Sequence, residues 1–366
     1  MKGAFYTMKT AAVCICNYNK KDLVISCLDA VLEQTLQDLD IYICDNGSTD
    51  GSAEALAKWI EEVDKSSDEI QITLLVNHEN LGGSGGFNTA MRAALEAKEE
   101  YRYLMCVDND CLLDEKVLSV LSTFLDEHED TGIAAAKIYH LEQPDVVQNF
   151  GQKIDYHTFS TEPLYYGCIE DGSMPRVVYS DAVPACALLI RRQLCESVGL
   201  LPEENFLYWD DTRWCQRVIA AGYKVASVGD AMALHSMGAR REDISTFPTY
   251  YAYRNWIAFF MEYAPEDRLY DLAETFLIRI YLEIAACYDG ERFARARTIM
   301  AAYEDAIHGV WGRAAEGIIS PVEKDGRQLS YEKISDLPEN KREGLNLFVY
   351  AHLPYFLSQI RKLRGK

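Results

Sequence analysis

The stretch YLMCVDND, residues 103–110, places two carboxylates one residue apart at the end of an apolar run. Residues 103–107 predict a buried strand, and Asp108 and Asp110 follow where that strand ends. Residues two apart on a strand face the same side, so both carboxylates can converge on one hard cation. Because this spacing is also common by chance, an acidic turn without a ligand is the competing interpretation.

The first hundred residues alternate short apolar runs with stretches of helical periodicity. The runs that predict strands are AAVCIC (11–16), LDIYICD (39–45), QITLLVN (71–77) and YLMCVD (103–108). Strands that alternate with helices predict parallel βαβ units, and ligands of such sheets bind beyond the carboxyl ends of the strands. Those ends carry Asn17 and Asn19, Asp45 and Asn46, residues 77–80, and Asp108 and Asp110. Four polar strand ends at one edge favour a nucleotide and metal site over an acidic turn.

A glycine-rich run, NLGGSGGFN, covers residues 80–88. It contains no GxGxxG and lacks the GK[ST] ending of a phosphate-binding P-loop, so neither nucleotide fingerprint applies. We expect a loop here, followed by a helix from about Phe87 to Lys98. Four glycines before a helix permit close approach of the backbone to a ligand, and the alternative is a turn that needs positive φ.

An acidic pair, Asp210 and Asp211, follows three aromatic residues in FLYWDDTRW, residues 206–214. The pair precedes a helical pattern at 212–221, where acids suit the helix dipole without any further role. Aromatic side chains before a carboxylate also suit a site that stacks on a sugar ring and holds a general base. His235 follows the apolar run 231–234, and by itself it is typical of an ordinary strand end.

Composition limits the class of partner and the compartment. The formal charge of −21 argues against binding nucleic acid through basic patches. Eleven cysteines without a CxxC pair predict reduced thiols in a cytoplasmic protein. Residues 1–10 lack the apolar stretch of a signal peptide, and no run of about 18 apolar residues predicts a membrane span.

The chain changes character after about Pro248, where long aromatic-rich helical patterns begin. We therefore expect an α/β catalytic domain over residues 1–247 and a helical domain over residues 248–366. The closing stretch YFLSQIRKLRGK carries four cations among apolar residues: Arg361, Lys362, Arg364 and Lys366. It predicts either a peripheral contact with an anionic membrane or a final helix packed in a core or at a homo-oligomer contact.

These motifs together resemble the family 2 glycosyltransferases with the GT-A fold, over roughly residues 10–255. The resemblance rests on ICNYN, DNGSTDGS, NLGGSGGFN, the DxD at Asp108–Asp110, the acidic pair and the later histidine, in that order and spacing. NLGGSGGFN, Trp209 and YYAYRN (250–255) look most like bacterial galactofuranosyl- and rhamnosyltransferases. The expected fold is an α/β nucleotide-diphospho-sugar transferase fold, with a mostly parallel central sheet flanked by helices and a helical C-terminal region.

The resemblance implies a role for each matching residue. It implies that the nucleotide sugar is bound by Asn17, Asn19, Asp45, Asn46, Gly82, Gly83 and Asp108. It implies that Asp108, Asp110 and His235 hold Mn²⁺ or Mg²⁺, and that Asp211 is the catalytic base. It implies acceptor contacts from Trp209, Asp210, Tyr250 and Arg254. Many relatives have an aspartate two residues beyond the base where this chain has Arg213, which affects only the acceptor side.

The implied activity is an inverting, metal-dependent transfer of galactofuranose or rhamnose from a UDP- or dTDP-sugar to a glycan or polyprenyl-linked glycan acceptor. UDP-glucose and UDP-galactose are also compatible donors. A sugar nucleotidyltransferase is a rival, but it would be expected to carry a glycine-rich basic loop after the first strand, and ICNYNKKD has no glycine. A non-catalytic glycan-binding relative is the other rival. It would be favoured by the loss of Asp108, Asp110, Asp211 or His235, all of which are present.

Overall fold

The computed structural model describes residues 8–63, 69–236, 245–320 and 326–365. The chain divides into two compact units, which we call the sheet unit (1–153, 161–203 and 210–239) and the helical unit (154–160, 204–209 and 240–366). The segments 154–160 and 204–209 thus belong to the helical unit, so the expected single boundary after residue 247 does not describe this division. Most of the N-terminal segment used above to exclude a signal peptide lies outside the described residues, as does Lys366.

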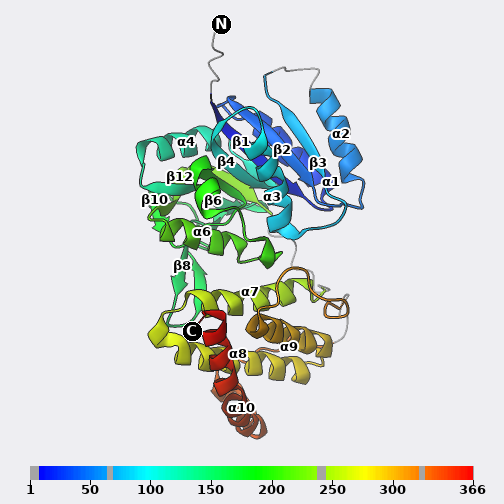
Figure 1. Ribbon diagram of the computed structural model, residues 1–366, viewed down its shortest axis with the longest axis vertical. Helices are drawn as coiled ribbons and strands as arrows, with labels where there is room; N and C mark the ends of the chain where they lie inside the picture. The colour runs from blue at the N-terminus through cyan, green and yellow to red at the C-terminus, as the bar shows by residue number, and fades with distance from the viewer. Residues whose placement is uncertain (1–7, 64–68, 237–244, 321–325, 366) are drawn as a thin grey trace. The chain divides into compact units, whose positions relative to one another are not determined.

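The sheet unit is built on one large mixed sheet with the strand order β10-β12-β6-β11-β4-β1-β2-β3 (Figure 1). Its first half is parallel, as predicted, and consists of β1 (Lys9–Asn17), β2 (Leu39–Asp45), β3 (Ile72–Val76) and β4 (Tyr101–Asp108). The second half adds β6 (Thr131–His140), β10 (Val177–Ser180), β11 (Ala187–Arg191) and β12 (Lys224–His235). β11 is antiparallel to both neighbours, whereas β6 and β12 are parallel to each other.

Helices cover both faces of this sheet, because alternate residues of each central strand point to opposite sides. Val13 and Ile15 of β1 face one core, together with α1 (Lys21–Leu32), α2 (Ser52–Val63) and α4 (Val117–Glu127). Ala12 and Cys14 face the other core, together with α3 (Gly82–Glu96), α5 (Arg192–Val198) and α6 (Asp210–Ala220). The predicted α/β architecture is confirmed.

The glycine-rich run is part of a helix, so the expectation of a loop up to Phe87 is wrong. α3 begins at Gly82, where φ is +79°, and the remaining glycines lie in its first turns. A Cβ on Gly86 would lie 2.2 Å from the Sγ of Cys16, which is too short for two atoms that are not bonded to each other. Gly86 therefore lets α3 approach β1 closely, at the edge of the sheet where the predicted site lies.

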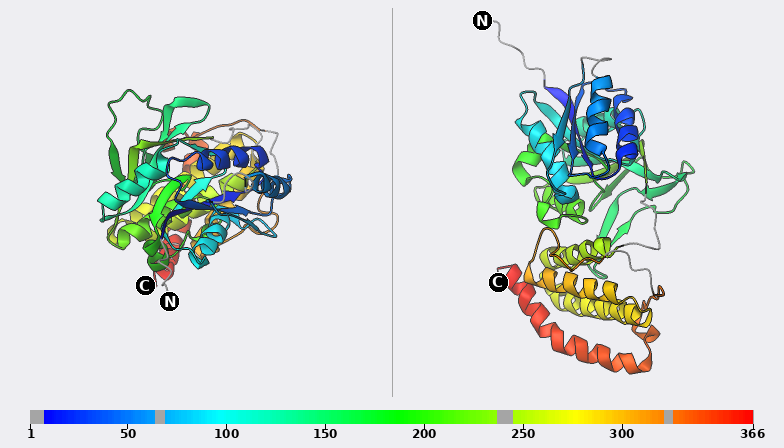
Figure 2. Two further views of the ribbon diagram at one scale, coloured as in Figure 1. Left: turned by 90° about the horizontal axis from the view of Figure 1, so that it is seen from above. Right: turned by 90° about the vertical axis from the view of Figure 1, so that its right-hand side faces the viewer.

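The helical unit contains α7 (Phe247–Tyr263), α8 (Leu269–Asp289), α9 (Phe293–His308) and α10 (Glu339–Leu363), which lie against one another (Figure 2). Phe356 and Ile360 of α10 are fully buried in the core of this unit. Arg364 donates hydrogen bonds to the carbonyls of Met261 and Ala264 at the end of α7, at 2.6 and 2.7 Å. The apolar side of the closing stretch is thus a packed helix end, while Arg361 and Lys362 are exposed.

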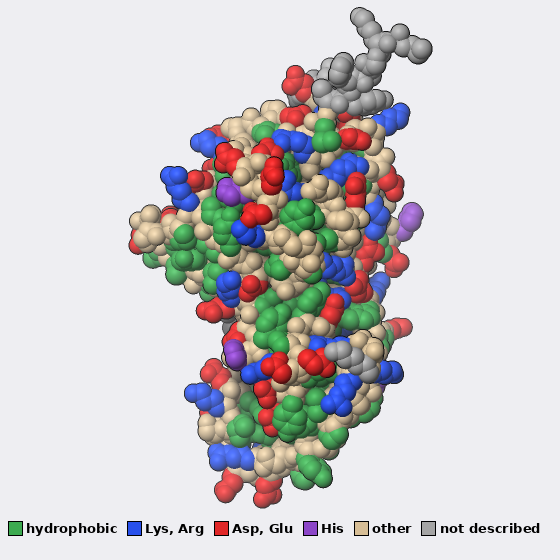
Figure 3. Space-filling model, turned by 60° about the vertical axis from the view of Figure 1, so that its left-hand side comes forward, with side chains coloured by type: hydrophobic (Ala, Val, Ile, Leu, Met, Phe, Trp, Pro, Cys, Tyr) green, Lys and Arg blue, Asp and Glu red, His purple; other side chains and the backbone are tan. Residues whose placement is uncertain are grey.

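Shorter strands complete the described structure: β5 (Cys111–Leu113), β7 (Gln143–Asn149), and a separate pair of β8 (Gln152–Asp155) and β9 (Ser160–Pro163). None of the described helices combines the length and the apolar character needed to cross a bilayer. On the face drawn in Figure 3, acidic and basic side chains are interspersed, so the surplus of acid does not gather into one patch there.

Candidate active site

The predicted metal ligands meet because the short strand β5 pairs with the end of the long strand β12. Asp108 is the last residue of β4, and Asp110 lies in the turn that leads to β5. β5 pairs with the end of β12 so that Cys111 lies opposite His235. This pairing carries His235 to the two aspartates from a position more than 120 residues later in the sequence.

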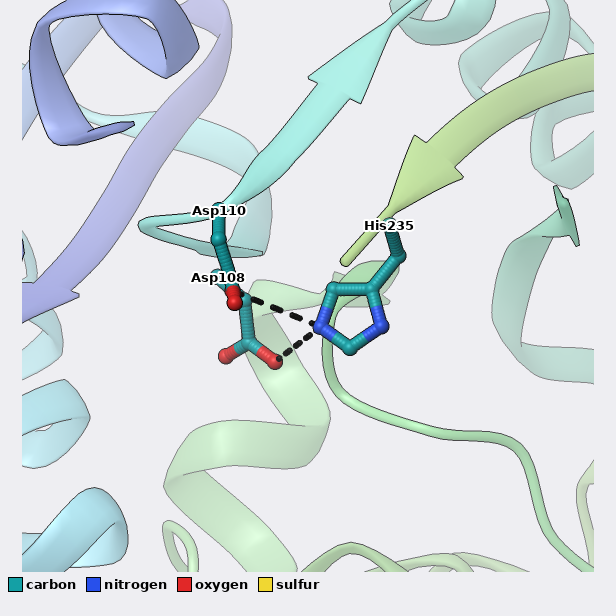
Figure 4. Close-up of side chains that lie close together, drawn as sticks. All are labelled: Asp108, Asp110 and His235. Carbon is teal, nitrogen blue, oxygen red and sulfur yellow. Dashed lines mark ion pairs between the residues drawn. The ribbon is translucent and has the colours of Figure 1, made fainter. Parts of the chain in front are cut away.

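The three side chains point toward one another (Figure 4). The Nε2 atom of His235 lies 3.5 Å from Oδ2 of Asp108 and 3.4 Å from Oδ1 of Asp110. One ligand atom from each residue lies within 4.8 Å of the others, so a single cation can reach all three. The other ring nitrogen, Nδ1, lies 2.8 Å from Oε1 of Gln148, which assigns the proton to Nδ1 when the ring is neutral and directs Nε2 toward the carboxylates. The donor set fits a divalent cation, since paired carboxylates suit Mg²⁺ and Mn²⁺.

Positive charge already surrounds Asp110, whose side chain is only 5% exposed. Lys20 forms an ion pair with its Oδ2 atom. Burial acts to raise the pKa of Asp110, but the hydrogen bond from His235 and the charge of Lys20 hold that pKa below its usual range. Burial acts to lower the pKa of His235, but the Cys186 side chain and the hydrogen bonds to Asp108 and Asp110 raise it to about 11. Without a metal, a proton on His235 thus occupies the place between the carboxylates that a cation would take.

The predicted nucleotide residues lie at neighbouring strand ends, where Asn17 and Asp45 are buried and Asn19 is exposed. Asn17, at the end of β1, donates from Nδ2 to Oδ1 of Asp45 at the end of β2, at 3.1 Å. Its Oδ1 accepts a hydrogen bond from Nδ2 of Asn109, between the two metal-site aspartates, at 2.8 Å. Asn19 accepts a hydrogen bond from the backbone N–H of Thr49 at 2.7 Å. The structure brings these residues to the same strand ends, and their contact with a nucleotide stays a prediction.

Asn46 holds the start of α3 with both sides of its amide. Its Nδ2 donates to the carbonyl of Gly82 at 2.9 Å and to Oδ1 of Asn80 at 3.1 Å, while its Oδ1 accepts from the N–H of Leu81 at 3.1 Å. Asn46 and Gly82 are buried, and Gly83 is partly exposed. These contacts fix the helix start at the site, and nucleotide binding by the three predicted residues stays a prediction.

The acidic pair forms the first turn of α6 within the same unit. Oδ2 of Asp210 accepts a hydrogen bond from the hydroxyl of Ser84 in the first turn of α3, at 2.7 Å. Oδ1 of Asp211 accepts from the N–H of Thr212 at 2.6 Å and from its hydroxyl at 3.2 Å. Burial and the neighbouring charge of Asp210 raise the pKa of Asp211 to about 7. A carboxylate with such a pKa is suited to accept a proton at neutral pH.

The predicted acceptor residues Trp209, Tyr250 and Arg254 belong to the helical unit, and the contacts described for them are internal to it. The Trp209 ring lies 5.1 Å from the ring of Phe259, measured between centroids. Tyr250 is fully buried, and its hydroxyl donates to Asp305. A role for these residues in acceptor binding stays a prediction, to which the structure adds a packing role.

Arg254 and Asn255 hold the backbone that comes directly before the acidic pair in the sequence. Both side chains are fully buried. Arg254 donates to the carbonyls of Asn205 and Gly312, at 2.7 and 2.6 Å. The Nδ2 atom of Asn255 donates to three carbonyls, those of Asn205 (2.9 Å), Leu207 (2.7 Å) and Tyr208 (3.1 Å). Left-handed φ angles, which residues other than glycine rarely adopt, occur in this segment at Phe206 (65°), Tyr208 (62°) and Trp209 (64°).

Four residues of the site escaped the sequence analysis: Lys20, Ser84, Asn109 and Gln148. Lys20 follows directly after ICNYN, Ser84 is the one side chain with a hydroxyl among the four glycines, and Asn109 lies inside the DxD motif. Their positions in recognised motifs are a signal that sequence reasoning can use. Gln148 carries no such signal, because it lies outside every motif that the sequence analysis identified.

Comparison with known proteins assigns the family. The model of glycosyl transferase family 2 matches residues 12–193. The galactofuranosyltransferase GlfT2 of Mycobacterium tuberculosis is 24% identical to this chain over 190 residues, which are 48% of this chain and 30% of that protein. The chain thus spans about a third of the length of this relative.

Solved structures show the same fold at low sequence identity. A mannosyltransferase from Pyrobaculum calidifontis, solved with GDP-mannose and Mn²⁺, matches 82% of this chain and 88% of its own, with a TM-score of 0.51 and 16% identity. GalNAc-T7, solved with UDP, GalNAc and Mn²⁺, matches 73% of this chain and 50% of its own, with a TM-score of 0.56 and 14% identity. Residues 12–193 of the chain form a domain of glycosyl transferase family 2, and the solved structures show that the chain has the GT-A fold.

Proposed function

We propose that the protein is an inverting, metal-dependent glycosyltransferase that moves a sugar from a nucleoside-diphosphate donor to a hydroxyl group of a glycan or lipid-linked glycan. The observation that carries this proposal is the pairing of two groups in one unit. A carboxylate with a pKa of about 7, Asp211, begins α6, and the Asp108–Asp110–His235 cluster lies at the ends of β4 and β12. Transfer of a glycosyl group needs a base for the acceptor and neutralising charge for the leaving group.

In this proposal Asp211 acts as the general base. Its carboxylate accepts the proton of the acceptor hydroxyl while the hydroxyl oxygen forms a bond to the anomeric carbon of the donor. The bond between that carbon and the phosphate oxygen breaks on the opposite side, and the electron pair leaves with the nucleoside diphosphate. A single displacement of this kind inverts the configuration at the anomeric carbon.

The proposed metal site neutralises the negative charge of the donor diphosphate. Asp108, Asp110 and His235 would hold Mn²⁺ or Mg²⁺, and such an ion, when bound, acts as a Lewis acid that stabilises the departing diphosphate. Asp110 is the most buried of the three, and Gln148 fixes the orientation of the imidazole. Lys20 is the further cation at this position, in an ion pair with Asp110.

The donor sugar is proposed from resemblance alone. The motif NLGGSGGFN, Trp209 and YYAYRN are similar to those of galactofuranosyl- and rhamnosyltransferases, and GlfT2 is named as a galactofuranosyltransferase. We therefore place UDP-galactofuranose and dTDP-rhamnose first among the donors, with UDP-galactose and UDP-glucose next. The proposed setting is synthesis of a bacterial cell-surface polysaccharide at the cytoplasmic side of the membrane.

The test is a donor panel of these four nucleotide sugars, each with and without Mn²⁺. The measurement is the rise in melting temperature on binding, followed by release of the nucleoside diphosphate by slow hydrolysis. We expect one donor to stabilise the protein and to be hydrolysed only when Mn²⁺ is present. The variant Asp211→Asn serves as the control, since it should bind this donor and fail to turn it over.

The same panel separates the rival functions. A sugar nucleotidyltransferase would consume a nucleoside triphosphate and a sugar 1-phosphate, releasing pyrophosphate, and would leave all four nucleotide sugars intact. A glycan-binding relative without activity would show neither turnover nor a difference between wild type and Asp211→Asn. Either result would contradict the proposal.

A further inference from the structure

Ser84 is a buried hydroxyl at a position where it touches one member of the acidic pair and not the other. Its side chain is fully buried, in the first turn of α3, between glycines. The hydroxyl donates to Oδ2 of Asp210 at 2.7 Å. The first turn of α3 contains no acidic residue, so Asp210 supplies the negative charge that a helix N-terminus favours.

We propose that Ser84 is a positioning residue that keeps Asp210 as the charged member of the pair and leaves Asp211 as the member that exchanges a proton. This inference rests on the proposed function of Asp211 as a base. It adds a role for Ser84 and a fixed charge on Asp210, neither of which the sequence motif or the family comparison assigns.

The argument starts from the donors that each carboxylate receives. Asp210 receives the Ser84 hydroxyl and backbone N–H groups at the start of α6, including its own and that of Asp211. Asp211 receives the N–H and the hydroxyl of Thr212. Hydrogen bonds to a carboxylate favour its charged form. Without the Ser84 hydroxyl, both carboxylates would keep donors only from their own helix, and the advantage of Asp210 would shrink.

The surroundings disfavour the charged form of both carboxylates and so raise the pKa of each. The charge of Asp108 from β4 acts on both. Cys16 from β1 and Cys106 from β4 face Asp210, and Cys215 faces Asp211 from within α6, but burial raises the pKa of each of these thiols, so they stay neutral. Burial acts in the same direction on both. Two adjacent carboxylates in such a setting lose their protons in two steps, and the order depends on the hydrogen bonds that distinguish them. The hydroxyl of Ser84, from α3, distinguishes them because it donates to Asp210 and not to Asp211.

The consequence for catalysis is a shift in the pH profile. When Asp210 is charged, its negative charge makes the adjacent Asp211 hold its proton more tightly and so makes it a stronger base. Removing the Ser84 hydroxyl lets Asp211 ionise first in part of the molecules. The acidic limb of kcat/KM should then become shallower and extend by about one pH unit toward lower pH, since a hydrogen bond to a charged group corresponds to roughly one to two pKa units.

The experiment compares four proteins over about pH 5 to 9: wild type, Ser84→Ala, Ser84→Thr and Ser122→Ala. Ser84→Thr keeps a hydroxyl and should keep the wild-type limb. Ser122 is a matched control, because its buried hydroxyl donates within α4, to the carbonyls of Leu118 at 2.7 Å and Ser119 at 3.2 Å. A uniform loss of rate in Ser84→Ala with an unchanged limb would show a merely structural role and would overturn the inference, as would a wild-type profile in that variant.

A second measurement does not depend on activity. The carboxyl carbons of Asp210 and Asp211 are followed by ¹³C NMR during a pH titration, with assignment from Asp210→Asn and Asp211→Asn. We expect the two titration midpoints to approach each other in Ser84→Ala and to stay apart in wild type and Ser122→Ala. If the midpoints respond to Ser84 but no nucleotide sugar is turned over, the proposed function fails and the inference about the pair stands. If Ser84→Ala leaves both midpoints unchanged, the inference fails whatever the activity.

Discussion

Replacing Asp211 by asparagine tests the proposed base with little change in shape. The wild-type carboxyl has a pKa of about 7, so about half of it is ionised at neutral pH and the active fraction falls about tenfold for each pH unit below. Asparagine cannot accept the proton at any pH. Loss of a general base costs about 10²–10⁴-fold in rate, which corresponds to about 2.7–5.5 kcal/mol of transition-state stabilisation.

The same substitution should raise the melting temperature. A carboxyl whose pKa is higher in the folded than in the unfolded protein favours the unfolded state once it ionises there. Asp211 therefore lowers the free energy of unfolding as the pH rises above about 4, and this loss of stability is complete above the folded-state pKa of about 7. Asparagine carries no charge and does not cause this loss. Asp211→Asn should therefore be more stable than wild type at pH 8 and equally stable at pH 3.

The assay measures transfer or donor hydrolysis at pH 8 beside a melting curve and donor binding by calorimetry. We expect a loss of at least a hundredfold in kcat, donor affinity within a few-fold of wild type, and a higher melting temperature. An Asp211→Asn protein with more than a tenth of the wild-type kcat would refute the assignment of the base. A greater loss in Asp210→Asn than in Asp211→Asn would move the role to the other member of the pair.

Four further predictions concern the metal site and the helical unit. Asp110→Asn should abolish the Mn²⁺-dependent rise in melting temperature, and full activity in EDTA would contradict it. Gln148→Leu should weaken Mn²⁺ binding, measured by calorimetry, by about 10–100-fold because the imidazole loses the partner that orients it. Asn255→Ala should lower the free energy of unfolding by about 2–4 kcal/mol, because three carbonyls lose their donor, whereas Asn340→Ala on the exposed start of α10 should leave it unchanged within about 0.5 kcal/mol. Deletion after Ser358 should lower the melting temperature, since it removes the buried Ile360, and an unchanged melting temperature with weaker binding to anionic vesicles would favour the membrane interpretation instead.

The parallel half of the sheet was predictable because its strands are apolar runs bounded by polar turns. The four predicted strands match β1 to β4 with small shifts at their ends. The helices of the C-terminal half were predictable for the same kind of reason, since long aromatic patterns repeat at helical spacing. The DxD pair, the acidic pair and His235 were identified by motif order, and the structure places each group at a strand end or helix start of the sheet unit.

What the sequence did not reveal depends on contacts between distant segments. TGIAAAKIYH, residues 131–140, is not among the strands predicted above, yet it forms the long, buried β6 because β11 and β12 pair with it on both sides. The glycines of α3 suggested a loop, whereas Gly86 lies too close to Cys16 to carry a side chain and Gly82 has a left-handed φ at the start of the helix. Arg254 resembles an acceptor ligand in sequence, but its described hydrogen bonds go to backbone carbonyls and to the Asn255 side chain, all within the helical unit.

The segment 204–209 illustrates the same limit for domain boundaries. It comes directly before α6 in the sequence, yet it belongs to the helical unit because Arg254 and Asn255 bond its carbonyls. Three aromatic residues of this segment have left-handed φ angles. The sequence does not predict these angles, because none of the three positions is a glycine. The buried side chains of Arg254 and Asn255 donate hydrogen bonds to this segment and so stabilise a backbone conformation that aromatic residues rarely adopt.

Metal-dependent turnover of a nucleotide sugar tests the central proposal most directly. Release of nucleoside diphosphate from the donor selected by the panel is followed in wild type with Mn²⁺, after addition of EDTA, and after Mn²⁺ is restored in excess, with Asp110→Asn measured in parallel. The proposal predicts turnover that stops with EDTA, returns with Mn²⁺ and is absent from Asp110→Asn in all three conditions. Turnover that persists in EDTA, or no turnover of any nucleotide sugar by a protein that binds Mn²⁺, would contradict it.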